Sequence, residues 1–265
     1  MTGTDRYCVM GHPVGHSRSP WIHARFAALT GQTLDYGAQL VALDGFAAAL
    51  RDFANAGGRG CNITVPFKHE AARLADTRSE RVAQAGAANT LVLAHGRIHA
   101  DNTDGLGLVA DIEQGAGVPL AGRDVLLIGA GGAAAGVLAP LLARAPGRLA
   151  VCNRTQARAE ALVERHLALA MLTKTELTAL GQQAPETDFD VIINATSSSL
   201  SGGGVPVPAS VLRPGSLACD MMYGAPAQGF LDWATQAAES FLLWRGVRPP
   251  AEQVLAELRA LLAPA

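Results

Sequence analysis

The feature that most restricts the fold of this chain is a glycine-rich turn that follows a short apolar run. Val125–Ile128 reads VLLI and Gly129–Ala134 reads GAGGAA. This fits G-x-G-x-x-A between a strand and a helix, where the first glycine forms a tight turn and the second lets the backbone approach a pyrophosphate. The start of the helix supplies N–H donors and a partial positive charge. The motif predicts a dinucleotide site; the alternative is a helix that packs through small residues.

Residues 125–145 are almost uncharged and about as long as a membrane span, which needs about 20 apolar residues. Four glycines and Pro140 interrupt this run, so a strand, a turn and a helix explain it better. We therefore expect no transmembrane helix. No apolar signal-peptide core follows Met1, which predicts a cytoplasmic protein.

The end of the next predicted strand indicates which dinucleotide is bound. A site for NAD would place an acidic residue about 20 positions after the glycines, on the ribose hydroxyls. Here the strand is followed by Asn153, Arg154 and Thr155, with Arg158 one turn later. Guanidinium groups and a hydroxyl would bind a 2′-phosphate, which a carboxylate would repel. The sequence favours NADP; the alternative is that both arginines belong to a solvated helix start.

Apolar strands and helices alternate on both sides of a glycine-rich link at residues 115–123. Ser19 and Asp44 read as helix caps, Pro20 and Pro66 as first-turn prolines, and His95-Gly96 as a hairpin turn. Strands are expected at 7–10, 34–41, 61–65, 89–94, 97–100, 124–128, 148–152, near 168–171 and at 189–194. Later helices are expected at 132–144, 155–166 and 226–262. The pattern predicts a two-domain α/β fold: a substrate domain (1–103), a doubly wound Rossmann-type nucleotide domain (104–235) and C-terminal helices (236–265).

Composition excludes several classes of function. The 265 residues are 49% hydrophobic with a net charge of -2, which gives no electrostatic reason to expect nucleic acid or an anionic membrane as partner. The four cysteines form no CxxC pair and are expected to be buried free thiols. The seven histidines form no ligand cluster, so no metal site is predicted.

Polar residues crowd the ends of apolar runs at three places in the first half: Ser17–Pro20, Asn62–Lys68 and Asp101–Gly105. Loops beyond strand ends are where binding sites form in open α/β sheets. Serines near a helix start could bind a carboxylate or simply cap the helix. A lysine in a first helical turn is poorly placed against the helix dipole, which is compatible with a role in proton transfer. Each motif alone is more often structural than catalytic.

Together these motifs resemble the shikimate dehydrogenase family. GHPVGHSRSP, GCNITVPFK, GAANTL, DNTDG, IGAGGAAAG, NRT, NATS and DMMY occur in this order, and the resemblance covers residues 7–262. It implies reversible NADPH-dependent reduction of 3-dehydroshikimate to shikimate, in the shikimate pathway to chorismate and the aromatic amino acids. It also implies two α/β domains, C-terminal helices that return to the first domain, and a monomer or homodimer whose partners are small molecules.

The resemblance also implies roles for individual residues. Lys68 and Asp104 would form the catalytic pair. Substrate would be bound by Ser17, Ser19, Asn62, Thr64, Asn89, Tyr223 and Gln236. NADP would be bound by Gly129, Ala130, Gly131, Gly132, Ala133, Ala134, Asn153, Arg154, Thr155, Arg158, Thr196, Ser197 and Met221.

The chain departs from the family pattern near its C-terminal end. The family's Gly-Leu-x-Met-Leu stretch is absent, and Phe230–Thr235 runs directly into Gln236. Residues 164–171 also leave little room for a turn. Either the protein has lost the stretch or the sequence omits residues. The alternatives to a biosynthetic enzyme are a quinate/shikimate dehydrogenase of broader specificity, a methylene-tetrahydrofolate dehydrogenase-like protein, and a non-catalytic NADP-binding protein.

Overall fold

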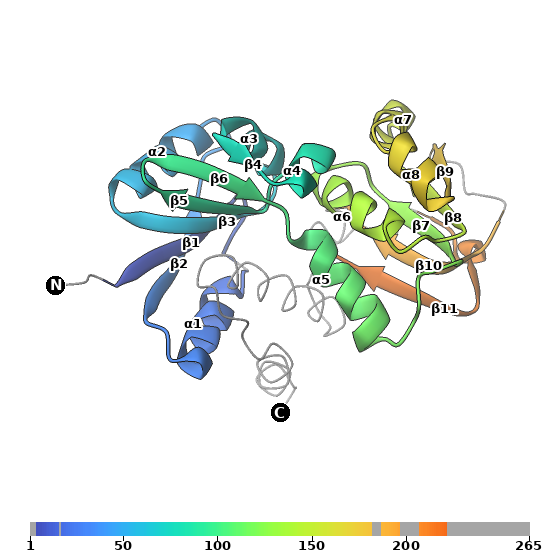
Figure 1. Cartoon of the computed structure of the whole chain (residues 1–265), viewed down its shortest axis with the longest axis horizontal. Helices are drawn as coiled ribbons and strands as arrows, with labels where there is room; N and C mark the ends of the chain where they lie inside the picture. The colour runs from blue at the N-terminus through green and yellow to red at the C-terminus, as the bar shows by residue number, and fades with distance from the viewer. Residues whose placement is uncertain (1–3, 16, 182–186, 197–206, 222–265) are drawn as a thin grey trace. The chain divides into compact units, whose positions relative to one another are not determined.

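The computed structural model describes residues 4–15, 17–181, 187–196 and 207–221 (Figure 1). These residues divide into two compact units, one ending at Gly107 and the other beginning at Leu108. Ser197, Tyr223, Gln236 and the helix expected at 226–262 lie outside the described residues. The three domain ranges inferred from the sequence stay predictions. In the described part of the chain, no helix has the length and apolar character needed to cross a membrane.

The first unit contains a mixed six-stranded sheet in the order β2-β1-β3-β5-β6-β4. Its strands are β1 (Asp5–Gly11), β2 (Leu34–Leu40), β3 (Gly58–Ile63), β4 (Thr77–Arg78), β5 (Thr90–Ala94) and β6 (Arg97–Asp101). Its helices are α1 (Ser19–Thr30), α2 (Phe46–Asn55), α3 (Lys68–Leu74) and α4 (Glu80–Ala85). β1 runs parallel to β2 and β3, whereas β5 is antiparallel to both β3 and β6. The carboxyl ends of β1, β3 and β6 and the start of β5 therefore lie at one edge of the sheet.

Local sequence explains several of these elements. His95 and Gly96 have φ values of 52° and 69°, so the predicted two-residue hairpin turn between β5 and β6 is confirmed. The apolar faces of α2 and the central strands meet in one core, in which Met10, Phe46 and Leu91 are fully buried. Burial of this apolar surface fixes the register of the strands, because a slip of one residue would turn each face outward.

The second unit contains a parallel five-stranded sheet in the order β11-β10-β7-β8-β9. Its strands are β7 (Asp124–Ile128), β8 (Arg148–Cys152), β9 (Glu176–Leu180), β10 (Phe189–Asn194) and β11 (Leu212–Asp220). Its helices are α6 (Gly132–Leu142), α7 (Gln156–Glu164), α8 (Leu167–Thr173) and the short η3 (Ala209–Val211). The helix α5 (Asp104–Ala110), which begins in the first unit, continues as the π-helix η1 (Asp111–Gly115).

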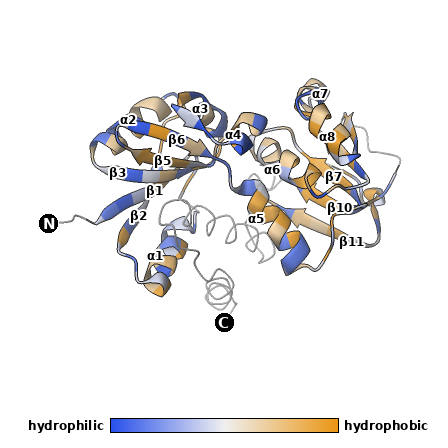
Figure 2. Ribbon diagram, in the orientation of Figure 1, coloured by the Kyte–Doolittle hydropathy of each residue, from blue (hydrophilic) through white to orange (hydrophobic). Residues whose placement is uncertain are grey.

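Strand order reverses between β7 and β10, which is the switch point of a doubly wound sheet. β7 and β10 are apolar along almost their whole length in Figure 2, and their residues are mostly buried. Parallel strands covered on both faces have this composition. The predicted α/β fold class with a Rossmann-type unit is confirmed.

The strand expected near 168–171 is wrong. Leu167–Thr173 forms α8, and the strand is Glu176–Leu180. The run LALAMLT consists mainly of leucine, alanine and methionine, which are good helix formers, and Lys174 ends the helix in a left-handed conformation with a φ of 58°. The short segment at 164–171 is therefore the junction of two helices.

Two helix caps expected from the sequence are also wrong. The residue before α2 is Gly45, not Asp44, and no side chain caps this helix. Ser19 is the first residue of α1 rather than its cap, which is Arg18. The hydroxyl of Ser17 accepts a hydrogen bond from the Ser19 amide at 3.2 Å, so the capping interaction comes from two residues earlier. Pro20 lies in the first turn, as predicted.

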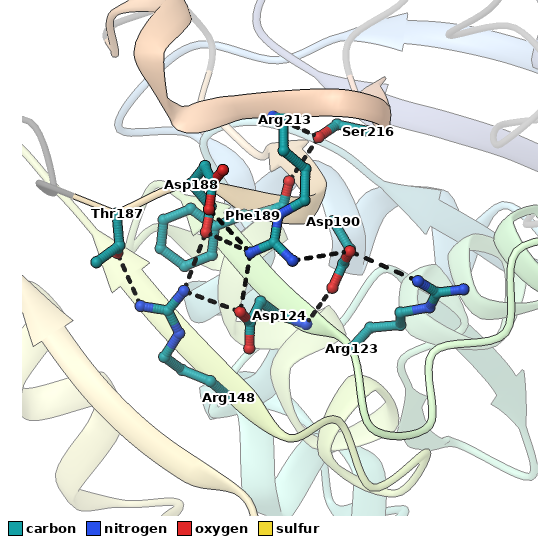
Figure 3. Close-up of polar contacts among 9 residues, drawn as sticks. All are labelled: Arg123, Asp124, Arg148, Thr187, Asp188, Phe189, Asp190, Arg213 and Ser216. Atoms are coloured by element: carbon teal, nitrogen blue, oxygen red, sulfur yellow. Dashed lines mark hydrogen bonds and ion pairs between the residues drawn. The ribbon is translucent and has the colours of Figure 1, made fainter.

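An ion cluster joins the amino ends of four strands in the second unit (Figure 3). Arg213 at the start of β11 pairs with Asp124 of β7 at 3.0 Å and with Asp190 of β10 at 3.1 Å. Arg148 of β8 also binds Asp124, at 3.1 Å, and its guanidinium lies 4.4 Å from the centre of the Phe189 ring. Paired charges thus stabilise the amino edge of this sheet, and none of these ion pairs involves the loops at its carboxyl edge.

The cluster predicts an acid-sensitive contribution to stability. Burial would raise the pKa of Asp124, but hydrogen bonds and charges from Arg148 and Arg213 outweigh it, so this pKa lies below its usual 3.8. A depressed folded-state pKa gives stability that is complete above the unfolded pKa and is lost as the pH falls through the folded pKa. Asp124→Asn is therefore expected to lower Tm at neutral pH, and the difference from wild type should shrink below about pH 4. Thermal unfolding followed by circular dichroism from about pH 7 to pH 2 checks this; a difference that stays constant with pH would contradict it.

Candidate active site

A lysine and a carboxylate meet at the polar edge of the first unit's sheet. Lys68 is the first residue of α3 and Asp104 the first residue of α5. Lys68 Nζ lies 2.5 Å from Asp104 Oδ2, with side-chain exposures of 15% and 3%. The ammonium group is therefore within reach of a ligand, while the carboxylate that orients it is buried. The structure brings together the two residues that the sequence assigned to catalysis.

Hydrogen bonds hold the Asp104 carboxylate and backbone in place. The Asn89 amide nitrogen donates to Asp104 Oδ1 at 2.8 Å and to Thr103 Oγ1 at 2.9 Å. The Asp104 backbone amide donates to the side-chain oxygen of Asn102 at 3.1 Å. All four residues are buried. A buried polar network with satisfied partners is rigid, so the carboxylate presents one oxygen to Lys68 in a fixed direction.

Asn62 lies on β3 and Thr64 lies just after its end at Ile63, whereas the strand was expected to run to residue 65. The Asn62 amide nitrogen lies 3.3 Å from both the Asn89 carbonyl oxygen and Thr90 Oγ1. The Thr64 amide donates to the Met10 carbonyl at 2.9 Å. A Cβ at Gly11 would lie 2.2 Å from Thr64 Cγ2, so only glycine leaves room for this threonine. This requirement for glycine at position 11 was not predicted. The signal available in the sequence was its place at the end of the first strand.

Ser17 and Ser19 lie in the loop after β1 and at the start of α1. Ser17 Oγ donates to Ser19 Oγ at 3.1 Å, so the two hydroxyls are neighbours. This loop is attached to the one after β3, because the His12 amide donates to the Val65 carbonyl at 2.9 Å. Both serines therefore belong to the same sheet edge as Asn62.

Asp101 and Arg81 support the turn that carries Asp104, a function that was not predicted. Arg81 binds both oxygens of Asp101, at 3.0 and 2.6 Å, and Ser79 donates to the same carboxylate at 2.6 Å. Burial would raise the pKa of Asp101, but these donors and the Arg81 charge hold it below the ordinary value. Asp101 in turn accepts from the Asn102 amide at 2.7 Å. The sequence held no local signal for this pair, since the two residues are 20 positions apart.

In the second unit the glycine-rich turn follows β7 at the carboxyl edge of the sheet. Gly129 has a φ of 115°, and a Cβ there would lie 3.1 Å from the Ala195 carbonyl oxygen. By contrast, nothing lies within 4 Å of a Cβ built on Gly131, the residue before α6. The turn thus combines one glycine that the chain geometry demands with one that borders open space at a helix N-terminus. This is the arrangement a pyrophosphate needs.

The other predicted cofactor residues lie at the ends of neighbouring strands. Arg154 and Arg158 are exposed after β8, where the Asn153 side chain donates to the Thr155 carbonyl at 2.9 Å. Thr196 follows β10 and donates to the Asn194 side chain at 2.7 Å. These residues fit a phosphorylated dinucleotide, because cationic side chains stand at the end of β8 where a ribose-binding carboxylate would stand for NAD.

Asn194 links the ends of β10 and β11, a role that was not predicted from the sequence. Its side-chain nitrogen donates to Asp220 Oδ2 at 2.9 Å, and its backbone carbonyl accepts from the Met221 amide at 2.9 Å. Met221 is therefore brought to the same edge as Thr196. The remaining predicted cofactor residues, Ala130, Gly132, Ala133 and Ala134, belong to the turn and the first turn of α6.

Comparison with known families gives matches to both units. A model described as the shikimate dehydrogenase substrate binding domain matches residues 9–91, and one described as shikimate / quinate 5-dehydrogenase matches residues 111–201. A shikimate dehydrogenase (NADP(+)) of Acidovorax sp. is 73% identical over 274 residues, covering 98% of this chain and 97% of that protein. Those 274 aligned positions exceed the 265 residues here by nine, so that relative has at least nine positions without a counterpart in this chain.

Solved structures are similar to this chain over almost its whole length. The Ael1 enzyme from Pseudomonas putida is 42% identical with a TM-score of 0.84, covering 96% of this chain and 98% of that one. Shikimate 5-dehydrogenase from Thermus thermophilus, solved with NADP(H) and shikimate, is 30% identical with a TM-score of 0.80, covering 98% of this chain and 100% of that one. With its two family domains, its Lys68–Asp104 pair and its glycine-rich turn, the chain belongs to the shikimate dehydrogenase family.

Proposed function

We propose that this protein catalyses the reversible NADP-dependent reduction of 3-dehydroshikimate to shikimate, in the biosynthesis of chorismate and the aromatic amino acids. The observation that supports it most directly is the Lys68–Asp104 pair at 2.5 Å, in a chain 73% identical to a protein named shikimate dehydrogenase (NADP(+)). The protein is proposed to act in the cytoplasm as a monomer or homodimer.

The proposed chemistry assigns a distinct task to each residue of the pair. When bound, reduced NADP supplies the hydride that reduces the substrate ketone. Lys68 stabilises the negative charge that develops on the ketone oxygen and donates a proton to it. Asp104 keeps the ammonium group in place through Oδ2, while Asn89 holds its other oxygen at 2.8 Å. Because Asp104 is buried, its charge acts on the lysine with little screening by water.

The substrate is proposed to lie at the polar edge of the first unit. Ser17 and Ser19 bind its carboxylate, and Asn62, Thr64 and Asn89 surround its ring hydroxyls. Tyr223 and Gln236 complete the set in this proposal, although both lie outside the described residues. The neighbouring hydroxyls of Ser17 and Ser19, 3.1 Å apart, support a shared anionic ligand group.

The cofactor is proposed to bind the second unit through the glycine turn and the ends of β8, β10 and β11. Its phosphates would be held by Gly129, Ala130, Gly131, Gly132, Ala133, Ala134, Asn153, Arg154, Thr155 and Arg158. Its nicotinamide half would lie along Thr196, Ser197 and Met221. The open space at Gly131 and the exposure of Arg154 and Arg158 support this placement.

Replacing Arg154 with alanine is expected to raise KM for NADP at least tenfold and to leave KM for NAD almost unchanged. A charge-assisted contact to a phosphate is worth about 1.5–3 kcal/mol, which corresponds to that change. Steady-state rates with both cofactors check it. Arg165→Ala, at an exposed arginine just after α7, is the matched control. Equal effects on both cofactors would mean that Arg154 does not bind the 2′-phosphate.

The proposed reaction is tested by initial rates of NADP reduction with shikimate, measured beside NAD and beside quinate. Turnover confined to NADP and shikimate supports the proposal. Comparable turnover of quinate would indicate a quinate/shikimate dehydrogenase of broader specificity. NADP binding without turnover of either acid would indicate a non-catalytic homologue, a possibility raised by the absent Gly-Leu-x-Met-Leu stretch.

A further inference from the structure

A buried aromatic pair lies next to the amide of Asn62 in the first unit. His23 comes from α1 and Tyr36 from β2, with exposures of 0% and 7%. Their ring centroids are 4.2 Å apart and their planes differ by 11°, so the rings are stacked. Phe26 packs edge-on against His23 at 5.9 Å. The imidazole thus packs against two aromatic rings, one of which is the stacked phenol.

The phenol fixes the orientation of the Asn62 amide. Tyr36 donates from its hydroxyl to Asn62 Oδ1 at 2.7 Å. Because an amide has its acceptor and its donors on different atoms, this bond sets the nitrogen toward β5, where Asn89 O and Thr90 Oγ1 each lie at 3.3 Å. Both distances exceed the usual 2.7–3.2 Å range for N–H···O bonds and describe weak bonds. The 2.7 Å bond from Tyr36 is the shortest of these three contacts, so it does most to orient the amide.

The imidazole adds no charge to this arrangement. Burial lowers the pKa of His23 to about 3, against a smaller opposite effect of a hydrogen bond with the Asn62 side chain. His23 is four residues after Ser19 on α1, and both side chains are buried. Residues at this spacing share one face of a helix. His23 thus connects the helix that begins at Ser19 to the amide on β3.

We propose that Tyr36 and His23 are positioning residues that hold the Asn62 amide in one orientation at the substrate edge of the sheet. The proposal rests on the proposed function, in which Asn62 binds a ring hydroxyl of shikimate. Without the Tyr36 hydroxyl, the amide loses the shortest of its three contacts and takes up other orientations in part of the population. Losing one neutral hydrogen bond corresponds to about fivefold weaker binding of the substrate.

The test is Tyr36→Phe, which removes only the hydroxyl. KM for shikimate is expected to rise about fivefold, with kcat and KM for NADP changed less than about twofold. The matched control is Tyr7→Phe, because Tyr7 is the register partner of Tyr36 on β1 and packs in the same cluster. His23→Leu is expected to act in the same direction, and the double variant should be no worse than the larger single one, since both act through one amide. A loss of stability alone would not raise one KM selectively.

A second readout separates this proposal from the proposed reaction. The side-chain NH₂ signals of Asn62, identified by their loss in Asn62→Asp, are recorded by ¹⁵N NMR in wild type and in Tyr36→Phe. Displaced Asn62 signals with a raised KM support the positioning role. Displaced signals in a protein whose wild type lacks turnover would overturn the reaction and retain the role. Unchanged Asn62 signals in Tyr36→Phe would overturn the role whether or not the wild type is active, and an unchanged KM for shikimate would overturn it in an active enzyme.

Discussion

Replacing Lys68 with alanine is expected to lower kcat about a thousandfold while KM for shikimate changes less than about fivefold. Positioned acid catalysis contributes about 10²–10⁴-fold, and the lysine also stabilises charge that exists only in the transition state. An interaction of this kind affects kcat rather than ground-state binding. Initial rates with saturating NADP and varied shikimate give both constants.

The chain offers a matched control, because its other lysine, Lys174, is exposed at the end of α8. Lys174→Ala is expected to leave kcat unchanged. Lys68→Arg keeps the positive charge but not the compact ammonium group, so it should also be slow. A Lys68→Ala variant within about tenfold of wild type would remove this lysine from the chemistry.

Replacing Gly131 with valine is expected to raise KM for NADP more than a hundredfold without unfolding the protein. Gly131 has an extended backbone, with φ −92° and ψ −169°, and nothing lies within 4 Å of its Cβ position. A valine there meets no protein atom at its Cβ, but it occupies the space at the start of α6 where phosphate oxygens would approach the amides. Tm is expected to stay within about 2 °C of wild type.

Gly129→Val separates a loss of ligand space from a loss of fold. Gly129 has a φ of 115°, and its Cβ would meet the Ala195 carbonyl oxygen at 3.1 Å, so valine there should lower Tm as well as NADP binding. Gly37→Val, on the exposed face of β2 with open space around it, is the neutral control. If Gly131→Val binds NADP as tightly as wild type, measured by fluorescence titration, the cofactor does not lie over this turn.

The accuracy of the sequence predictions follows from the range of the interactions involved. The strand and turn at Val125–Gly131 are specified by neighbours, and so is the His95-Gly96 hairpin, and both were predicted. The strand expected near 168–171 failed because a short apolar run has no period that separates a strand from a buried helix. Leu167–Thr173 forms α8 because its leucines, alanines and methionine favour a helix, and Ala170 is its one buried residue, so local propensity outweighs packing here.

The candidate site divides in the same way. Lys68 and Asp104 could be assigned from motifs, although their 2.5 Å contact joins residues 36 positions apart. The supporting contacts could not be predicted, because no motif marks them. Tyr36 reaches Asn62 across 26 positions and Arg81 reaches Asp101 across 20. Such contacts depend on strand order, which the sequence alone left open.

The charged cluster around Arg213 has a consequence for how this domain can change over evolutionary time. Its members stand at the amino ends of β7, β8, β10 and β11 (Figure 3). They are a full strand length away from the loops that follow the same strands. Substitutions there can adjust heat tolerance without altering ligand preference, and changes at Arg154 can alter cofactor choice without weakening the cluster. Lineages adapting to temperature and lineages adapting to a new nucleotide can therefore draw on separate sets of positions in one sheet.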